Sequence, residues 1–382
     1  MMLRNRGRRV LIDGTMAKGG GGFTYLVNIL PRVCALAPDT RFRVLVRSER
    51  LAQSIAPAAN LEVDLLPEAG WIERLRFTYR EIPRLVREWS AHLFFSVGES
   101  APLWTDCPRI ASFRNPIVFT SFDLGFTWTE RLRTVLLREV ARLSSRTCDR
   151  IMFVSEDSAK WIGNLLAIPT KRRAVIYHGI DTAAWTSAGR PAACDSYILT
   201  VGSIYPHKNY VRLIEAYAAI ARRRPEAPDL VIVGDECDAA FRAEMERARS
   251  AADEGIAERI HIVGEVPYAE IKAWYAGAAL YVFPSYLETF GHPLLEAMAS
   301  GVPVVAADIP ALREVADEAA VFADPHETRS LARAMEKALL PEARAELIRR
   351  GHRRVAQFGW NRSAQRLLAL FDEVLAERAR AA

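Results

Sequence analysis

Short uninterrupted apolar runs recur along this chain and alternate with longer stretches in which apolar residues return every three or four positions. Runs of this length, bounded by glycine or polar residues, predict buried strands, and the longer stretches predict amphipathic helices. The predicted strands cover 8–13, 42–46, 61–65, 92–96, 109–113, 150–154, 197–202, 230–234, 260–264, 279–283 and 304–307. Regular alternation of strands and helices predicts an α/β fold with doubly wound parallel sheets.

A composition change near the middle of the chain predicts a domain boundary. Residues 182–196 are rich in Ala, Gly, Pro and Ser, which is typical of a linker. We therefore expect a first domain over 1–183 and a second over 195–360. The last helical stretch, 361–382, has one apolar face and must dock on another element.

Basic residues are concentrated at the start of the chain. The net charge is +5, and residues 1–50 hold ten Lys or Arg against three Asp or Glu. Such a surface can meet nucleic acid, anionic lipid or an anionic substrate, or it can simply be solvated. No nucleic-acid motif accompanies it. The amphipathic stretch 130–146 carries Arg138, Arg142 and Arg146 at helical spacing, which suits either contact with anionic lipid or a solvated face.

The cysteines and the apolar runs bear on the compartment. Five scattered cysteines form no C-x-x-C pair, which favours reduced thiols and argues against a metal cluster. No apolar run reaches the roughly 18 residues of a membrane span. The basic N-terminus continues only into Val10, Leu11 and Ile12 before Asp13, which is not typical of a signal peptide. A cytoplasmic location is expected.

The most informative stretch, 279–307, predicts a strand, a loop, a short helix and a second strand. Pro293 suits a first helical position, and Gly301 suits the left-handed residue past a helix end. The loop 288–292 runs into the helix start, where amides and the helix dipole favour phosphate, and Gly291 lets backbone approach a ligand. Glu288 and Glu296, the latter expected in the first helical turn, suit sugar hydroxyls. An ordinary βαβ unit with surface glutamates is the alternative.

Two other strand-to-helix turns carry candidate residues. In 197–209, Lys208 should lie beside a helix start as a point charge for a diphosphate, with Ser203 nearby. Gly20, Gly21 and Gly22 are expected in a glycine-rich turn after the first strand, either beside a ligand or as a flexible loop. Their spacing matches neither a dinucleotide fingerprint nor a P-loop.

The string E-T-F-G-H-P-L-L-E-A-M-A-S-G-V-P-V-V, which starts at Glu288, resembles the E-x7-E signature of retaining GT-B glycosyltransferases, most closely family 4. The segments 171–181 and 197–209 resemble other strings of that family. The resemblance implies two doubly wound Rossmann-like domains facing across a cleft, with 361–382 returning to the first. Glycosyl transfer then needs a stabilised diphosphate leaving group. The chain has no Asp-x-Asp triplet, so no metal is expected.

The resemblance also implies roles for individual residues. Glu288 and Lys208 would be catalytic. The donor nucleotide sugar would be bound by Ser203, Lys208, Gly264, Thr289, Phe290, Gly291, His292 and Glu296. The cleft side of the first domain would present Gly20, Gly21, Gly22, Arg114 and Asn115. Two departures stand out: Ser203 occupies a position where many members have arginine, and Arg114-Asn115 occupies a region where many have histidine.

The expected function is metal-independent, retaining transfer of a hexosyl group from a nucleotide-diphosphate sugar, such as GDP-mannose or a UDP-hexose. The acceptor would be a glycan or a polyprenyl-diphosphate-linked glycan in cell-surface polysaccharide assembly. No separate cofactor and no nucleic-acid partner are expected. The basic first domain is compatible with peripheral contact with the anionic inner face of the membrane. A nucleotide-sugar epimerase or hydrolase, and a non-catalytic partner subunit, are the alternatives. The sequence leaves front-face and double-displacement routes open.

Overall fold

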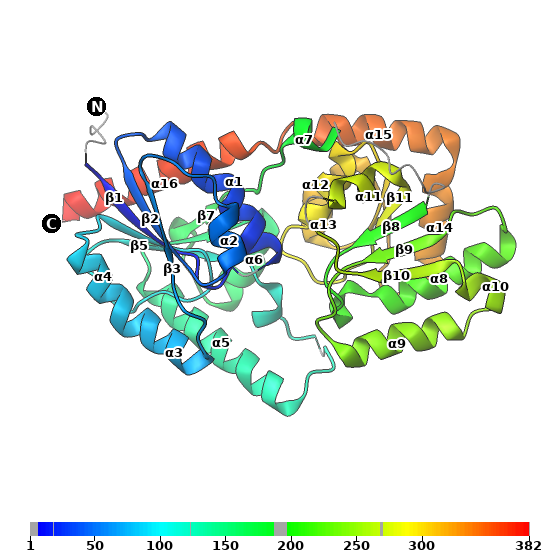
Figure 1. The fold of residues 1–382 in the computed structure, drawn as a ribbon, viewed down its shortest axis with the longest axis horizontal. Helices are drawn as coiled ribbons and strands as arrows, with labels where there is room; N and C mark the ends of the chain where they lie inside the picture. Colours follow the sequence, from blue (N-terminus) through cyan, green and yellow to red (C-terminus); the bar gives the residue numbers. More distant parts are fainter. Residues whose placement is uncertain (1–6, 18, 123, 187–196, 268–269, 382) are drawn as a thin grey trace. The chain divides into compact units, whose positions relative to one another are not determined.

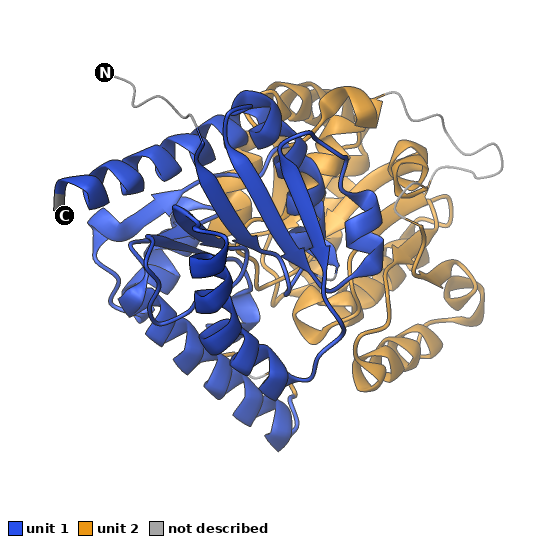
Figure 2. Ribbon diagram, turned by 60° about the vertical axis from the view of Figure 1, so that its left-hand side comes forward, with its two compact units in different colours: residues 1–121, 126–179, 359–382 blue, residues 122–125, 180–358 orange. Residues whose placement is uncertain are grey.

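The structure, a computed structural model, describes residues 7–381 apart from 18, 123, 187–196 and 268–269. The chain divides into two compact units (Figures 1 and 2): unit 1 comprises residues 1–121, 126–179 and 359–382, and unit 2 comprises residues 122–125 and 180–358. Most of the predicted linker, 187–196, lies outside the described residues. No helix within the described ranges has both the length and the apolar composition that a membrane crossing requires.

In the described residues, unit 1 is built on a seven-stranded parallel sheet with the order β3-β2-β1-β4-β5-β6-β7. Its strands are β1 Arg9–Asp13, β2 Arg41–Val46, β3 Leu61–Leu65, β4 Leu93–Ser96, β5 Arg109–Phe113, β6 Arg150–Phe153 and β7 Arg173–Val175. Each lies within one residue of its predicted bounds, except β7, which the apolar runs did not predict. Three residues of intermediate burial give β7 no apolar run to detect.

Helices cover both faces of this sheet. They are α1 Gly20–Leu36, α2 Glu49–Ser54, α3 Trp71–Arg76, the π-helix η1 Phe77–Glu81, α4 Ile82–Glu88, α5 Trp128–Thr147, α6 Glu156–Leu165 and α16 Trp360–Ala381, with short 3-10 turns η2 Pro116–Val118 and η3 Thr170–Arg172. Successive residues of β1 point to opposite faces of the sheet. Val10 and Ile12 pack with α1 and α16 on one face, and Leu11 packs into the core on the other face. Phe371 of α16 packs edge-on against Phe95 of β4, 5.6 Å between ring centres.

The prediction that Gly20, Gly21 and Gly22 form a turn before the helix was wrong, because all three belong to the first turn of α1. Glycine weakens a helix by about 1 kcal/mol relative to alanine, so propensity argues against this start. Tertiary packing overrides it: Tyr25 and Leu26, one turn later, are fully buried in the unit 1 core.

Unit 2 repeats the plan with six described parallel strands in the order β10-β9-β8-β11-β12-β13. The strands are β8 Tyr197–Val201, β9 Leu230–Val233, β10 Ile260–Gly264, β11 Ala278–Phe283, β12 Val304–Ala307 and β13 Ala320–Ala323. The flanking elements are α7 Thr182–Thr186, η4 Pro206–Lys208, α8 Tyr210–Arg223, α9 Ala239–Ser250, α10 Glu254–Ala257, α11 Ile271–Gly277, α12 His292–Ala299, α13 Pro310–Ala316, η5 Asp317–Ala319, α14 Thr328–Leu339 and α15 Pro341–Val355.

The strand order of unit 2 fixes where a ligand can bind. The chain builds the sheet outward from β8 to β10, then returns to add β11 on the other side of β8. In such open sheets ligands bind beyond the carboxyl ends of the strands at the point where the order reverses. Here that point lies between the loops that follow β8 and β11. Both loops carry residues singled out from the sequence.

Candidate functional site

The loop after β8 turns sharply and carries Lys208 at the end of η4. Asn209 follows in the left-handed conformation, φ 63°, and starts α8. Its side-chain amide donates to the carbonyls of Pro284, 3.1 Å away, and Pro325, 2.7 Å away. Asn209 thereby fastens the β8 loop to the β11 loop and fixes the place of the neighbouring Lys208.

Close backbone contact also shapes this edge of the sheet. A Cβ on Gly234, just past β9, would lie 1.9 Å from the carbonyl oxygen of Gly202, just past β8. No side chain fits there, which explains why a glycine follows β9. The glycines that end these strands therefore serve the packing of two loops against each other.

The β11 loop leads through Glu288 to Gly291 and the start of α12. The carbonyl of His207 accepts two hydrogen bonds from this loop, one from the Ser285 hydroxyl at 3.1 Å and one from the Tyr286 amide at 3.0 Å. Gly291 has φ +87°, and a Cβ there would lie 2.5 Å from Leu312 Cδ2. Glycine at 291 is thus required by both the left-handed backbone and the packing behind it.

Lys208 and Glu288, 80 positions apart in sequence, form an ion pair with 2.6 Å between Nζ and Oε1. Only 15% of the Lys208 side chain and 13% of the Glu288 side chain are exposed. The ammonium also lies over the ring of Phe283, 5.3 Å from its centre. The two residues predicted to be catalytic are therefore in direct contact, and the ammonium retains donor capacity for an anion because it has three hydrogens.

Glu296 is also buried, but it belongs to a different network. Its Oε2 accepts a hydrogen bond from the Tyr275 hydroxyl at 3.0 Å, and its Oε1 lies 3.1 Å from His292 Nδ1. Burial raises the pKa of Tyr275 well above its usual value. The phenol therefore stays protonated and acts as the donor in its hydrogen bond to Glu296. The expectation that Glu296 lies in the first turn of the helix was wrong: α12 begins at His292 and places Glu296 in its second turn.

Ser203 is committed to another partner. It lies near the carboxylate of Asp235, which accepts a hydrogen bond from Cys237 Sγ at 2.9 Å. Burial works to raise the pKa of Asp235, but the hydrogen bonds from Cys237 and Ser203 outweigh it and lower that pKa. The residue that stands where many family members have arginine thus faces a carboxylate in this structure.

The remaining residues of unit 2 that were predicted to bind the donor make packing or backbone contacts in the structure. Thr289 and Phe290 are buried, and the Phe290 ring lies edge-on to Phe358, 6.0 Å between centres. Gly264 ends β10 with φ +87° and nothing within 4 Å of a hypothetical Cβ. Its carbonyl accepts the Gly234 amide at 2.9 Å. The loop beyond Gly264, expected to hold the base, includes 268–269, which lie outside the described residues.

In unit 1, Arg114 and Asn115 follow β5. Glu99 Oε1 accepts both of their backbone amides, at 2.9 and 2.8 Å. The Arg114 guanidinium stacks on the ring of Tyr25, 3.6 Å from its centre, and its Nε donates to Ser112 Oγ at 2.7 Å. Burial lowers the pKa of Arg114, and the Tyr25 hydroxyl and Glu99 oppose that effect.

Sequence reasoning missed three residues that organise the unit 2 site: His207, Asn209 and Tyr275. Burial and the adjacent Lys208 ammonium lower the pKa of His207 to about 2, so its ring stays neutral beside the cation. Asn209 adjoins Lys208 in sequence, and a left-handed asparagine is a known signal at such a turn. Tyr275 lies in a helix far along the chain from Lys208, and no sequence pattern links it to Glu296.

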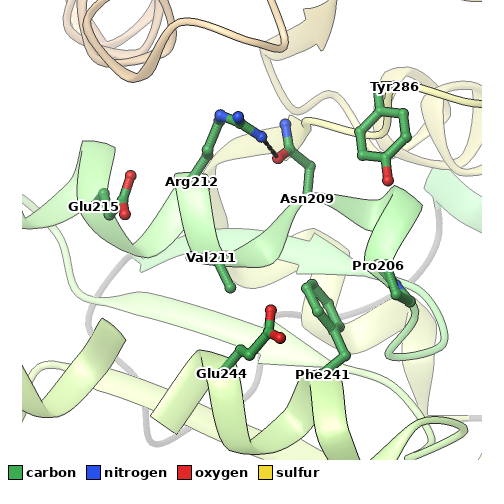
Figure 3. Close-up of a pocket in the computed structure, with 8 residues that line it drawn as sticks. All are labelled: Pro206, Asn209, Val211, Arg212, Glu215, Phe241, Glu244 and Tyr286. Carbon is green, nitrogen blue, oxygen red and sulfur yellow. Dashed lines mark hydrogen bonds between the residues drawn. The ribbon is translucent and has the colours of Figure 1, made fainter. Parts of the chain in front are cut away.

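A pocket of about 310 Å³ adjoins this site between α8 and α9 (Figure 3). Its lining residues are Pro206, Asn209, Val211, Arg212, Glu215, Phe241, Glu244 and Tyr286. Arg212 donates to Asn209 Oδ1 at 3.0 Å, and Glu215 accepts from Thr328 at 3.0 Å. Two carboxylates and one guanidinium give this pocket little complementarity to a diphosphate.

Comparison with known proteins identifies the family of the chain. The family described as "Glycosyl transferases group 1" matches residues 188–354, and the family described as "Glycosyltransferase Family 4" matches residues 24–184. This chain belongs to glycosyltransferase family 4. The family predicted from the sequence, and the pair of Rossmann-like domains characteristic of the GT-B fold, are therefore confirmed.

Similar proteins include the O-antigen chain mannosyltransferase RfbU of Salmonella typhimurium, 27% identical over 61% of this chain and 62% of the relative. A D-inositol 3-phosphate glycosyltransferase of Acidothermus cellulolyticus is 27% identical over 92% of this chain and 81% of its own length. The match to RfbU, like that to a Thermobispora bispora D-inositol 3-phosphate glycosyltransferase, spans about three-fifths of the relative.

Solved structures share the fold at lower identity. Sucrose-phosphate synthase from Thermosynechococcus elongatus has a TM-score of 0.76 at 17% identity, covering 97% of this chain and all of that one. Anabaena HepE, solved in complex with UDP and glucose, has a TM-score of 0.73 at 18% identity, covering 96% of this chain and all of that one. At these identities the likeness extends to the fold alone.

Proposed function

We propose that this family 4 protein is a retaining glycosyltransferase that moves a hexosyl group from a nucleotide-diphosphate sugar to a glycan or lipid-linked acceptor. The observation that carries the proposal is the meeting of Lys208 and Glu288 at the switch point of the unit 2 sheet. A cation and a carboxylate at that edge, beside the start of α12, match the two halves of the donor: a diphosphate and a sugar rich in hydroxyls.

Lys208 would offset part of the negative charge of the diphosphate. Its ammonium is paired with Glu288 and lies over the Phe283 ring, and these two contacts fix its position at the edge of the sheet. Because the leaving nucleoside diphosphate gains negative charge as the glycosidic bond breaks, a preplaced cation lowers the barrier at that stage. The start of α12 adds its dipole, with Gly291 in the conformation that allows close approach. The scheme needs no metal ion.

Glu288 would accept hydrogen bonds from the donor sugar, and Glu296 from the ribose diol. Each carboxylate has about four lone-pair sites, so the contacts with Lys208, Tyr275 and His292 leave room for hydroxyl donors. Ser203 and Gly264 would border the nucleotide, and Thr289, Phe290 and His292 would contribute backbone. Gly20, Gly21, Gly22, Arg114 and Asn115 are proposed on the acceptor side.

The chemical step would be substitution at the anomeric carbon with retention. An acceptor oxygen forms the new bond to that carbon, the bond to the diphosphate oxygen breaks, and the nucleoside diphosphate leaves with the electron pair. In a front-face route the acceptor proton passes to a phosphate oxygen. The ion pair with Lys208 reduces the nucleophilicity of Glu288, which favours this route over double displacement through that carboxylate.

The donor would be GDP-mannose or a UDP-hexose. Two observations support this choice: a mannosyltransferase of O-antigen chains is among the relatives, and HepE was solved with UDP and UDP-glucose. The O-antigen relatives also support an acceptor in cell-surface polysaccharide assembly, with the growing glycan on a polyprenyl diphosphate. We place the reaction in the cytoplasm, at the inner face of the membrane, with no role for nucleic acid.

A thermal-shift screen with GDP, UDP and ADP sugars tests the proposal, followed by product analysis with and without a lipid-linked acceptor. We expect one nucleotide series to raise the melting temperature and sugar to move only when acceptor is present. Conversion or hydrolysis of the donor in the absence of acceptor would instead identify an epimerase or hydrolase. Absence of a shift with every nucleotide would point to a non-catalytic partner subunit and overturn the proposal.

A further inference from the structure

Helix α5 presents an apolar side to solvent. Trp128 is 76% exposed, Leu132 and Val135 are each 52% exposed, and Leu136 and Leu143 are 46% and 43% exposed. These five residues recur at spacings of four, three, one and seven along the helix and therefore share one side. Scattered exposed apolar residues are common, but five on one helix side mark a surface that meets a partner.

The side of α5 that faces the core is unusually polar and small. Its buried residues are Ala141, Ser144 and Ser145. Ser144 Oγ accepts the Ala101 amide at 3.0 Å, and Arg138 donates to the carbonyls of Val118 and Thr120 at 2.8 and 2.7 Å. A surface helix of a globular protein normally turns its apolar stripe inward. In α5 the buried residues are small or polar and Leu137 packs on the core, so packing within unit 1 leaves the five apolar residues of the other side exposed.

Arginines border the apolar side of α5. The helix contains five Arg and two Glu. Arg131, Arg133 and Arg146 are exposed, and Glu139, which lies on the apolar side, is neutralised by Arg142 at 2.7 Å. Arg138 leaves the stripe predicted from the sequence because it bonds inward. The exposed side of α5 thus combines apolar residues with an excess of arginine: Arg131 and Arg133 lie beside the apolar side, and Arg146 lies at its C-terminal end.

A second helix of unit 1 also exposes apolar residues. Helix α3 exposes Trp71 and Ile72, at 62% and 56%, and carries Arg74 and Arg76 in its last turn. Phe77, in the π-helix that continues α3, packs against the same core cluster as Leu137 of α5. Figure 1 shows α3 and α5 along the same edge of unit 1. We call the exposed residues Trp71, Ile72, Trp128, Leu132, Val135, Leu136 and Leu143 the α3/α5 face.

We propose that the α3/α5 face docks on the surface of an anionic phospholipid bilayer. Its leucines and tryptophans enter the boundary between headgroups and acyl chains, and the bordering arginines contact lipid phosphates. Apolar side chains flanked by arginine, with tryptophan at the helix start, fit a membrane interface because that interface offers hydrocarbon beside negative charge. The inference assigns a specific surface to the membrane location proposed above, and it does not depend on the sugar transfer itself.

Vesicle flotation of the full chain tests the proposal with vesicles of phosphatidylcholine alone and of phosphatidylcholine containing phosphatidylglycerol. The apolar variant is Leu132→Ser with Leu136→Ser. Its matched control is Leu36→Ser with Leu165→Ser, which removes two leucines that are 44% and 42% exposed on α1 and α6. The charge variant is Arg133→Gln with Arg146→Gln, matched by Arg247→Gln with Arg329→Gln in unit 2. Nucleotide binding by calorimetry is measured on each, to separate this surface from the donor site.

We expect the wild type and both controls to float with phosphatidylglycerol vesicles and to stay in solution with phosphatidylcholine alone. The apolar variant should lose at least about tenfold in partitioning, and the charge variant several-fold, with an effect that shrinks as salt rises. Nucleotide binding should be unchanged in all variants. Failure of the wild type to float, or equal flotation of the apolar variant and its control, would overturn the proposal. So would a dimer, seen by light scattering, that the apolar variant abolishes without any vesicle binding.

Discussion

The ion pair between Lys208 and Glu288 permits a test that separates stability from donor binding. Lys208→Met removes the ammonium while keeping an unbranched chain over the Phe283 ring. Glu288 is then left with a carboxylate that is 13% exposed and has lost its cation. Breaking a buried pair costs about 3–5 kcal/mol. Because solvent reaches part of this pair, we expect a loss of about 2–4 kcal/mol in the free energy of unfolding.

The double variant Lys208→Met, Glu288→Gln should recover most of that loss, because it leaves no unpaired charge. Donor binding should not recover. A charge-assisted hydrogen bond contributes about 1.5–3 kcal/mol, so either variant without the ammonium should bind a nucleoside diphosphate about 10- to 150-fold more weakly. Stability and binding should therefore move apart in a way that a purely structural lysine would not produce.

The assays are urea denaturation of the four members of the double-mutant cycle and titration calorimetry with the nucleoside diphosphate that the wild type binds. Lys272→Met is the matched control, because Lys272 also lies over a ring, 5.7 Å from the centre of Trp185, yet belongs to no predicted site. It should bind nucleotide as the wild type does. Unchanged affinity in Lys208→Met, or recovered affinity in the double variant, would refute the role given to Lys208.

Three further predictions concern the surroundings of this pair. Gly291→Ala should lower the free energy of unfolding by about 2–5 kcal/mol, because the added Cβ overlaps Leu312 and the backbone is left-handed. Gly264→Ala has the same φ but open space around the Cβ, so it should lower that free energy by only about 1–2 kcal/mol. Equal losses for the two variants in urea denaturation would contradict the packing argument. His207 has a pKa of about 2 in the folded state against about 6.5 in the unfolded state, so only the unfolded state binds a proton as the pH falls below 6.5. The free energy of unfolding should therefore decrease by about 1.4 kcal/mol for each unit that the pH is lowered. His207→Gln should lack this component of the slope, and parallel pH profiles of the wild type and the variant would exclude a buried neutral His207 as its cause. Glu296→Gln keeps an acceptor for the Tyr275 hydroxyl, so the free energy of unfolding should change by less than about 1 kcal/mol. The KM for the donor should rise roughly tenfold or more. An unaltered KM in initial-rate kinetics would show that Glu296 is not part of the nucleotide site.

The layout of the fold could be predicted from the sequence because parallel strands buried on both faces appear as continuous apolar runs. The run 230–233 is such a case, and all four residues are buried in β9. β7 escaped because its three residues are only partly buried. The helix start at Gly20 was not predicted for another reason. The low helix propensity of glycine disfavours a helix there, and the start is determined instead by tertiary packing of the turn that follows.

The site shows where sequence reasoning ends. Lys208 and Glu288 were each predicted from their own loop, but their contact depends on β8 lying beside β11, and strand order is set by the whole sheet. Likewise, periodicity showed that α5 has an apolar side without showing that this side faces outward. That orientation depends on which residues meet the sheet, here Ala141, Ser144 and Ser145.

A crystal structure of the protein soaked with its nucleotide-diphosphate sugar would test the central claim most directly. We predict diphosphate oxygens within hydrogen-bond distance, about 3 Å, of Lys208 Nζ, with ribose hydroxyls on Glu296 and sugar hydroxyls on Glu288. A nucleotide bound elsewhere, for example in the pocket between α8 and α9, with the Lys208–Glu288 pair undisturbed, would contradict the account.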